Sequence, residues 1–363
     1  MKYEILARKY RPKCFKEIIG QKYIVKSIHN SLETNKIHQS WIFSGNSGIG
    51  KTTISRLLAK SLSCEKGITY FSCLKCKNCI EILKGCFIDL IEIDAASKTK
   101  VEEIKKILEN VKYLPVKGRF KIYIIDEVHM LSKHSFNALL KILEEPPIHV
   151  KFILATTNIN KIPETIISRC ICFYLNHITE KQIYKYLKNI LKKEKIKIEK
   201  NIINIIYEAS KGNVRSALNI IEQSILLNQH KITEKNVINI LGIIEQKKIL
   251  LLTKYLIKKE LNKTFHILKK INISEYQWHT IFDNILKLLH HIAILKKFGF
   301  SIEKHEYMKN YRNNIIKIVK NTKFSEIQRC YHIIIKGKRE IEISPNSKIC
   351  AEMTFLRILE KDN

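Results

Sequence analysis

The feature that most constrains the fold is a glycine-rich loop, GNSGIGKT, at residues 45–52. It fits the pattern G-x-x-x-x-G-K-[ST], and it lies between an apolar run, WIFSG, and a segment with helical spacing, TTISRLLAKSL. In that context the backbone N–H groups of the loop surround phosphate oxygens, Lys51 reaches the β- and γ-phosphates, and Thr52 holds Mg²⁺. The dipole of the following helix also attracts the anion. The loop predicts a nucleotide-binding α/β fold, and the alternative is a chance glycine turn.

Five short apolar runs alternate with helical patterns over the first half of the chain, at 41–45, 87–94, 121–127, 151–157 and 170–175. This alternation predicts a parallel sheet covered by helices. After residue 178 the strand signal stops, and amphipathic spacing indicates three or four helices up to 242 and further helices beyond. We therefore expect three domains: an α/β domain at 1–178, a small helical domain at 179–242 and an all-α domain at 243–363.

An acidic pair, Asp126 and Glu127, ends the apolar run KIYIIDE. Such a pair is often only a strand cap. After a phosphate loop earlier in the chain, however, it is the expected second half of the site, with Asp126 near Mg²⁺ and Glu127 as the base that orients attacking water. The next run ends in Thr156, Thr157 and Asn158, any of which can hydrogen-bond the water or the γ-phosphate.

Four of the ten cysteines fall within residues 64–79, as Cys64, Cys73, Cys76 and Cys79. The spacing C-x₈-C-x₂-C-x₂-C supplies four thiolates for a closed tetrahedral Zn²⁺ site, whereas a catalytic zinc keeps an open position. Cys86 lies close by, but its neighbours place it at the start of a strand. Cys170 and Cys172 alternate along a strand, which favours core packing. Cys14, Cys330 and Cys350 have no metal-ligand spacing.

The formal net charge is +31, which permits binding to nucleic acid because lysine and arginine neutralise phosphates. The charge is spread along the chain and comes from 55 lysines and only ten arginines, so a general drift in composition explains it equally well. Where lysine serves for ordinary positive charge, arginine is expected mainly where its planar fork matters. No apolar run reaches the roughly 20 residues that span a bilayer, and no secretory signal begins the chain. We expect a cytoplasmic protein with reduced thiols and no membrane partner.

Several motifs together resemble one family: YRPKCFKEIIGQ, GNSGIGKTT, the cysteine cluster, IEIDAASKTKVEEI, GRFKIYIIDEVHMLSKHSFNALLKILEEPP, LATTN and ISRC, in that order. They are similar to the gamma/tau subunits of the bacterial DNA polymerase III clamp loader, which are AAA+ ATPases. The similarity is dense over 1–178, looser over 179–242 and slight over 243–363. It implies an AAA+ ATPase domain with a zinc-binding insertion at about 64–79, a helical lid domain and an all-α collar domain for oligomerisation.

The resemblance also implies a function: ATP-dependent loading of a ring-shaped sliding clamp onto primed DNA, in an assembly with delta and delta-prime subunits and further copies of the chain. It assigns catalysis to Lys51, Glu127 and Arg169, with Arg169 as the arginine finger. The implied cofactors are ATP, Mg²⁺ and a structural Zn²⁺. The implied nucleotide contacts are Gly45, Asn46, Ser47, Gly48, Ile49, Gly50, Lys51, Thr52, Thr53, Asp126, Thr156 or Thr157 as the first sensor, and Arg215 as the second sensor in the lid.

Alternatives remain at this point. Arg169 and Arg215 can each be ordinary surface arginines, and Ser216 stands where the family usually has an acidic residue, which weakens a pairing that would hold Arg215. The chain can also be a nucleotide-binding scaffold without turnover, against which Lys51, Thr52, Asp126 and Glu127 all argue. A zinc-dependent DNA-binding protein would need basic or aromatic residues throughout the cysteine loop, where only Lys75 and Lys77 qualify.

Overall fold

A computed structural model of the chain describes residues 4–97, 109–196, 198–228, 232–241, 246–270, 278–299 and 312–360. The chain divides into two compact units, Met1–Val237 and Ile238–Asn363. Part of the motif at 91–104 and the expected domain boundary at 242 lie outside the described residues. The other expected boundary, at 178, falls between the last strand of the sheet and the next helix. The finer division into three domains stays a prediction.

A five-stranded parallel sheet organises the first unit, in the order β2-β3-β4-β1-β5. The predicted parallel α/β class is thereby confirmed. Because β3, β4 and β1 are parallel neighbours, their carboxyl ends lie together at one edge of the sheet, where the phosphate loop follows β1. The strands are β1 Ser40–Ser44, β2 Leu90–Asp94, β3 Lys121–Asp126, β4 Val150–Thr156 and β5 Ile171–Tyr174.

Strand β2 begins at Leu90, three residues later than the apolar run predicted. The cause is Asp89, a buried carboxylate that accepts three backbone N–H groups at 2.7 Å each. Its donors come from the loop before β3: Val116, Lys117 and Gly118. Asp89 therefore fixes the loop before β3. The residues beside Asp89 in sequence form a turn, after which β2 begins to pair with β3.

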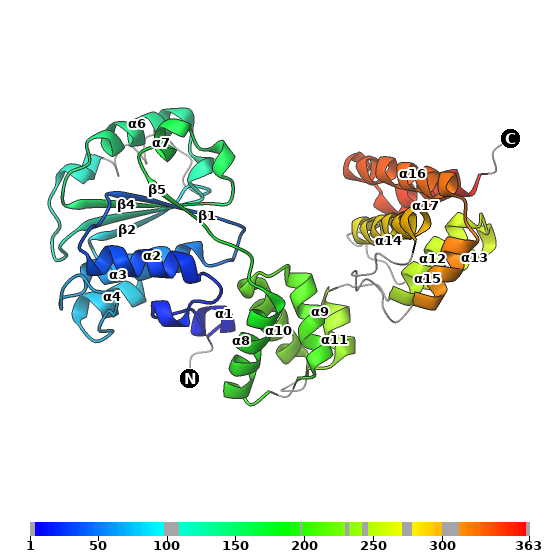
Figure 1. The fold of residues 1–363 in the computed structure, drawn as a ribbon, viewed down its shortest axis with the longest axis horizontal. Helices are drawn as coiled ribbons and strands as arrows, with labels where there is room; N and C mark the ends of the chain where they lie inside the picture. The colour runs from blue at the N-terminus through cyan, green and yellow to red at the C-terminus, as the bar shows by residue number, and fades with distance from the viewer. Residues whose placement is uncertain are drawn as a thin grey trace. The chain divides into compact units, whose positions relative to one another are not determined.

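Alternate residues of the central strands pack on opposite faces of the sheet, as the period of two requires. Ile122 and Ile124 join a core with α2 and α3, whereas Tyr123 and Ile125 join a core with α6. Figure 1 shows α2, α3 and α4 on one side of the sheet, with α6 and α7 on the other. These helices, with the short helix near the N-terminus, are α1 Leu6–Lys9, α2 Lys22–Glu33, α3 Lys51–Ser63, α4 Lys77–Lys84, α6 Lys133–Glu144 and α7 Glu164–Ile167.

From residue 180 onward every described element is a helix, as the sequence predicted. Thr179 starts the series with a capping box, in which Oε1 of Gln182 accepts the backbone N–H of Thr179. The next four helices are α8 Glu180–Lys193, α9 Lys200–Ser210, α10 Val214–Asn228 and α11 Glu234–Leu241. The connections are short, and the left-handed Lys211 and Gly212 turn the chain from α9 into α10.

The second unit has its own apolar core, in which Phe282, Ile285, Ile334 and Phe355 are completely buried. Helix α14 supplies the longest buried stripe and packs against α16, which packs on α17. The helices are α12 Gln246–Ile257, α13 Leu261–Lys270, α14 Trp278–Phe298, α15 Arg312–Lys320, α16 Phe324–Ile343 and α17 Ser347–Leu359.

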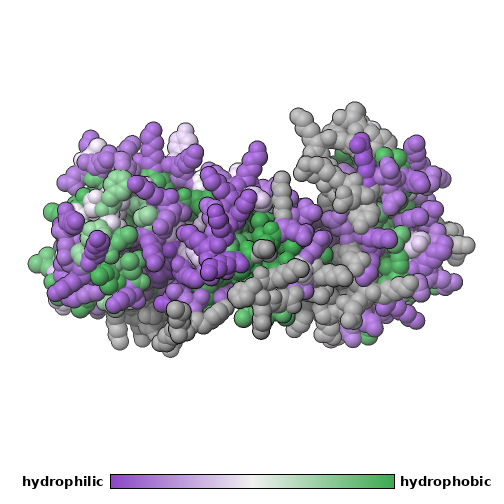
Figure 2. Space-filling view, turned by 90° about the horizontal axis from the view of Figure 1, so that it is seen from below, coloured by the Kyte–Doolittle hydropathy of each residue, from purple (hydrophilic) through white to green (hydrophobic). Residues whose placement is uncertain are grey.

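Hydrophilic side chains cover much of the face seen in Figure 2, as the high lysine content leads one to expect. Within the described part of the chain, no helix combines the length and the apolar character needed to cross a bilayer.

Candidate functional site

The phosphate loop runs from Gly45 to Gly50, between β1 and α3. Gly50 caps the helix with φ +111°, a conformation that side chains disfavour, and no neighbouring atom would obstruct a Cβ there. The glycine is thus needed for its backbone angle alone. Lys51 and Thr52 then occupy the first turn of α3, where backbone N–H groups have no partner within the helix and favour an anion.

Lys51 is buried at the base of this loop. Its Nζ donates to the carbonyl oxygens of Gly45 at 2.8 Å and Asn46 at 3.1 Å, and it lies 3.9 Å from Oε1 of Glu127. Burial lowers the pKa of Lys51, which the nearby Glu127 and Asp126 carboxylates partly oppose. The ammonium is therefore held between backbone carbonyls and one acidic side chain, in the position from which it can reach a phosphate.

Asp126 ends β3 and meets the first turn of α3. Its Oδ2 accepts the Thr52 hydroxyl at 2.6 Å, and its Oδ1 accepts the backbone N–H of Glu127 at 3.0 Å. A hydroxyl and a carboxylate side by side are the oxygen ligands that Mg²⁺ prefers. Thr52 and Asp126 thus fit the two protein positions of a magnesium site beside the phosphate loop.

Glu127 has a left-handed backbone, φ +48°, which turns its side chain toward the end of β4. Its Oε2 accepts the backbone N–H of Thr157 at 3.1 Å and the Thr157 hydroxyl at 2.9 Å. Nδ1 of His129 lies 3.4 Å from the same oxygen. Thr156 is buried and bonds His129 instead, at 3.0 Å. Of the two threonines that the sequence offered, Thr157 is the one that contacts the acidic pair.

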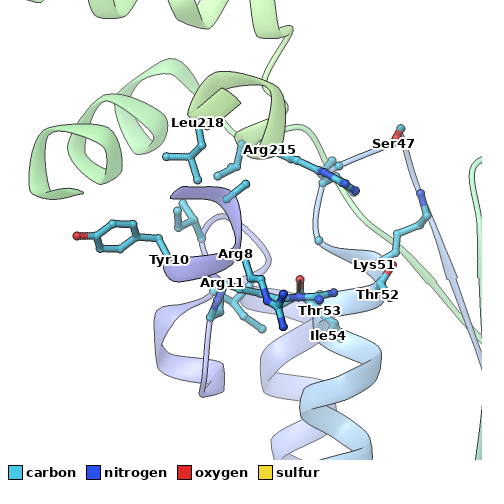
Figure 3. A pocket seen from close by; sticks show the side chains of 18 of the residues that line it. Arg8, Tyr10, Arg11, Ser47, Lys51, Thr52, Thr53, Ile54, Arg215 and Leu218 are labelled. Atoms are coloured by element: carbon cyan, nitrogen blue, oxygen red, sulfur yellow. Dashed lines mark hydrogen bonds between the residues drawn. The ribbon is translucent and has the colours of Figure 1, made fainter. Parts of the chain in front are cut away.

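A cavity of about 560 Å³ opens beside these residues. The phosphate loop, the acidic pair, the N-terminal segment and the lid all contribute to its wall, through residues that include Arg8, Arg11, Ser47, Lys51, Thr53, Asp126, Glu127 and Arg215. Arg215 extends from the first turn of α10 toward the loop that carries Ser47 and Lys51 (Figure 3). The structure therefore brings the lid arginine to the same cavity as the phosphate loop.

The sequence patterns assigned no role to Arg11, although this residue lies against α3, the helix that follows the phosphate loop. Its Nε donates to Oγ1 of Thr53 at 3.2 Å, and burial lowers its pKa, with a further contribution from Arg56. Arg8 lines the cavity beside it (Figure 3). The signal was available, because both are among the ten arginines of a lysine-rich chain.

Arg169 lies away from this cavity and is not part of its wall. It follows α7, donates to the Thr165 carbonyl oxygen at 2.6 Å and pairs with Oε1 of Glu144 on α6 at 2.9 Å. The guanidinium is partly exposed, with a side-chain accessibility of 35 %. The structure thus does not bring Arg169 to the phosphate loop of its own chain.

The four clustered cysteines converge. The sulfur atoms of Cys64, Cys73, Cys76 and Cys79 all lie within 4.8 Å of one another, and those of Cys73 and Cys79 are 4.0 Å apart. Four sulfurs around Zn²⁺ at about 2.3 Å lie about 3.8 Å from each other, so the cluster has nearly the size of a zinc site. The cluster contains no histidine or carboxylate ligand.

Local backbone geometry prepares this cluster. Cys64 ends α3, Cys76 caps α4, and Cys79 lies in the first turn of α4. The backbone N–H of Cys76 donates to the Cys73 sulfur at 3.3 Å, and that of Cys79 to the Cys76 sulfur at 3.4 Å. Such N–H bonds stabilise thiolates. The residues therefore fit a structural Zn²⁺.

The remaining cysteines lie elsewhere. Cys86 is exposed and precedes β2 by four residues, so its predicted place at the start of a strand is wrong, because the turn at Asp89 delays the strand. Cys170 and Cys172 pack against the core beneath α6, as predicted.

Comparison with known proteins places these features in a family. Three family models match in succession: the delta subunit of DNA polymerase III over residues 20–179, the ATPase lid domain of the DNA polymerase III clamp loader subunit over 182–230, and domain III of DNA polymerase III subunits gamma and tau over 232–362.

Similar proteins are named as the gamma or tau subunit of DNA polymerase III. The DNA polymerase III subunit gamma of Buchnera aphidicola subsp. Schizaphis graminum is 51 % identical over 99 % of both chains. The subunit tau of Escherichia coli is 40 % identical over 99 % of this chain and 56 % of its own. The subunit tau of Bacillus subtilis is 44 % identical over 62 % of this chain and 40 % of its own. With identity this high along nearly the whole chain, the protein belongs to the gamma/tau family of DNA polymerase III clamp-loader ATPases.

Proposed function

We propose that this chain is the ATP-hydrolysing motor of a clamp loader, which places a sliding clamp on primed DNA. The observation that carries the proposal is the convergence of Lys51, Thr52, Asp126 and Glu127 at one edge of the sheet. All four side-chain types that phosphoryl transfer to water requires are present and in contact. A scaffold that only binds nucleotide has no need of a second acidic residue beside the phosphate loop to activate water.

Each residue has a chemical task in this proposal. The N–H groups of residues 45–53 and the Lys51 ammonium bind the phosphates of ATP. Thr52 and Asp126 hold Mg²⁺, which when bound neutralises charge on the phosphate oxygens. Glu127 orients the attacking water and accepts its proton. Thr157 is the first sensor, because its hydroxyl and N–H hold the Glu127 carboxylate in place.

Arg215 acts as the second sensor. It is exposed, it lines the cavity of the phosphate loop, and it comes from α10, whereas Lys51 begins α3. A guanidinium in that position can bind a phosphate oxygen and so couple nucleotide binding to the lid. Thr156, the other candidate for the first sensor, is assigned a packing role beside His129.

Arg169 acts on the neighbouring subunit. Its position outside the wall of its own chain's cavity and its partly exposed pairing with Glu144 support a role in trans. Arginine fingers stabilise charge on the γ-phosphate, with effects on rate of roughly 10³ to 10⁵. We expect Arg169→Ala to keep ATP affinity and lose stimulated hydrolysis, and Arg169→Lys to behave alike because an ammonium lacks the two-pronged geometry.

A mixing experiment tests the role in trans. Arg169→Ala and Lys51→Ala chains are combined in one assembly, where an intact arginine can face an intact phosphate loop. Some hydrolysis should return in the mixture. No recovery in a verified mixed assembly would show that Arg169 serves its own site or only the contact with α6.

Zn²⁺ is assigned to Cys64, Cys73, Cys76 and Cys79, where it joins the end of α3 to the start of α4. It has a structural role only. Because α3 begins at the phosphate loop, loss of the metal is expected to loosen the far end of the helix that carries Lys51.

The proposed partners follow from the family: clamp-loader subunits delta and delta-prime, further copies of this chain, the sliding clamp and primed DNA. The test of the whole proposal is ATP turnover by the purified chain, alone and with these partners. We expect low turnover alone and strong stimulation in the complete mixture. Nucleotide binding without turnover under any combination would instead favour the scaffold.

A further inference from the structure

One side chain connects the lid directly to the phosphate loop. Asn213, in the turn before α10, donates from Nδ2 to the carbonyl oxygen of Ser47 at 2.7 Å. Its Oδ1 accepts the backbone N–H of Ser216 at 3.0 Å. The same amide thus holds a loop residue with one end and caps the first turn of α10 with the other.

The fit between Asn213 and the loop is close. A Cβ placed on Gly48 would lie 2.2 Å from Oδ1 and 2.4 Å from Nδ2 of Asn213, and Gly48 also has φ +69°. Position 48 therefore requires glycine both for its backbone angle and for the space that the asparagine occupies. The turn that delivers Asn213 is itself fixed, because its N–H donates to the Ser210 carbonyl at 2.9 Å.

This contact is compatible with a bound nucleotide. A phosphate loop binds its ligand through backbone N–H groups, so the Ser47 carbonyl oxygen stays available to Asn213 while the N–H groups are engaged. A second polar contact lies nearby, where Nδ2 of Asn46 is 3.1 Å from Nε2 of His177, in the segment leading to α8. The first contact joins the loop to the turn before α10, and the second joins it to the segment before α8.

Arg215 lies two residues after Asn213, on the helical turn that Asn213 caps, and it extends toward the loop (Figure 3). Because the Arg215 side chain starts from this turn, the position of the turn sets which part of the loop the guanidinium can reach. We propose that Asn213 is a positioning residue for nucleotide binding: it holds the first turn of α10 against the phosphate loop so that Arg215 reaches the bound phosphates. This inference rests on the nucleotide site proposed above.

The chain offers a matched pair of variants. Asn213→Ser keeps a good helix cap but is too short to donate to Ser47, so it removes the connection and leaves the cap. Asn213→Asp also caps well but places a carboxylate where a donor is needed. Both variants separate loss of the connection from loss of the helix, and thermal unfolding compares their stability with that of the wild-type chain.

The test is a double-mutant cycle on the full chain, with binding of Mg²⁺-ATP measured by fluorescence of a labelled analogue in wild type, Asn213→Ser, Arg215→Ala and the double variant. Loss of one hydrogen bond predicts a rise in Kd of roughly three- to tenfold for Asn213→Ser. In the Arg215→Ala background the same change should have no further effect, whereas a residue with a merely structural role would weaken both backgrounds equally.

Three outcomes overturn the proposal. Asn213→Ser and Asn213→Asp can bind ATP as tightly as wild type. Their effects can be fully additive with Arg215→Ala, which would show that Asn213 acts independently of the arginine. The nucleotide site itself would be overturned if the wild-type chain did not bind ATP, or if the Lys51→Ala variant bound ATP with the same affinity as the wild type. The first two results leave that site intact, so the two failures are distinguishable.

Discussion

Lys51→Ala perturbs the most buried charge of the proposed ATP site. The Lys51 side chain is 4 % exposed, and the ammonium now bonds two carbonyl oxygens, those of Gly45 and Asn46. These are neutral acceptors, and burial lowers the pKa of the group. A bound phosphate offers charged oxygens instead, so the ammonium gains more from ATP than it gives up from the carbonyls.

The magnitude follows from the bonds involved. Hydrogen bonds between charged partners contribute about 1.5–3 kcal/mol each. Two of them from Nζ to the β- and γ-phosphates are therefore expected to contribute about 3–6 kcal/mol. Their loss predicts a rise in the Kd for ATP of about 10²- to 10⁴-fold, since each 1.4 kcal/mol is tenfold.

Thermal unfolding with and without Mg²⁺-ATP measures the effect. At an ATP concentration about 100 times the Kd of the wild type, ligand binding stabilises the wild-type chain by about 2.7 kcal/mol, and the variant should gain almost nothing. Lys151→Met is the matched control, because Lys151 is similarly buried but is the second residue of β4, at the end of the strands away from the phosphate loop, where it donates to Gln39 at 2.7 Å. A Kd for Lys51→Ala within tenfold of wild type, with the control unchanged, would refute the reasoning.

Three further predictions concern metal, stability and pH. The chain purified without chelators should hold one zinc, and Cys76→Ser should lose it and unfold at lower temperature, whereas the exposed Cys86→Ser should keep it; equal zinc content in both variants would contradict the site. Asp89→Asn should lower the free energy of unfolding by about 1.5–3 kcal/mol in urea, because an amide can accept at only one of the two oxygen positions that now bind three N–H groups; an unchanged midpoint would show that water replaces the bond at no cost. Burial lowers the pKa of Lys151 from 10.5 to about 8, so between these values the folded chain binds fewer protons than the unfolded chain and its stability rises with pH. Lys151→Met should lose that rise, and parallel pH profiles of the two proteins would rule it out.

Much of the fold was predictable because local patterns and tertiary structure agree. The five apolar runs became the five strands: β1, β3 and β4 are largely buried in the centre of the parallel sheet, whereas β2 and β5 lie at its edges and are only partly buried. The start of β2 was not predictable, because Asp89 looks like an ordinary polar residue within an apolar run. Its three backbone donors lie 27 to 29 residues away, and only the folded chain brings them together.

In the candidate site too, some residues could be predicted from the sequence and others could not. Lys51, Thr52, Asp126 and Glu127 follow motifs with fixed spacing, so their convergence could be expected. The choice between Thr156, which ends β4, and Thr157, which follows it, depended on where each side chain points in the folded chain and on the left-handed backbone of Glu127, neither of which the sequence displays. Asn213 gave no signal either, because its partner Ser47 is 166 residues away and the bond goes to a backbone carbonyl.

In the proposed function, this chain hydrolyses ATP with Glu127 as the residue that activates water. The most direct measurement compares Glu127→Gln with wild type in the complete mixture of partner subunits, clamp and primed DNA. Glutamine keeps the size of the side chain and can still accept from Thr157, so ATP affinity should stay within a few-fold of wild type. Hydrolysis should slow by about 10²- to 10⁴-fold, the usual contribution of a general base. Equal turnover in the two proteins would contradict the account.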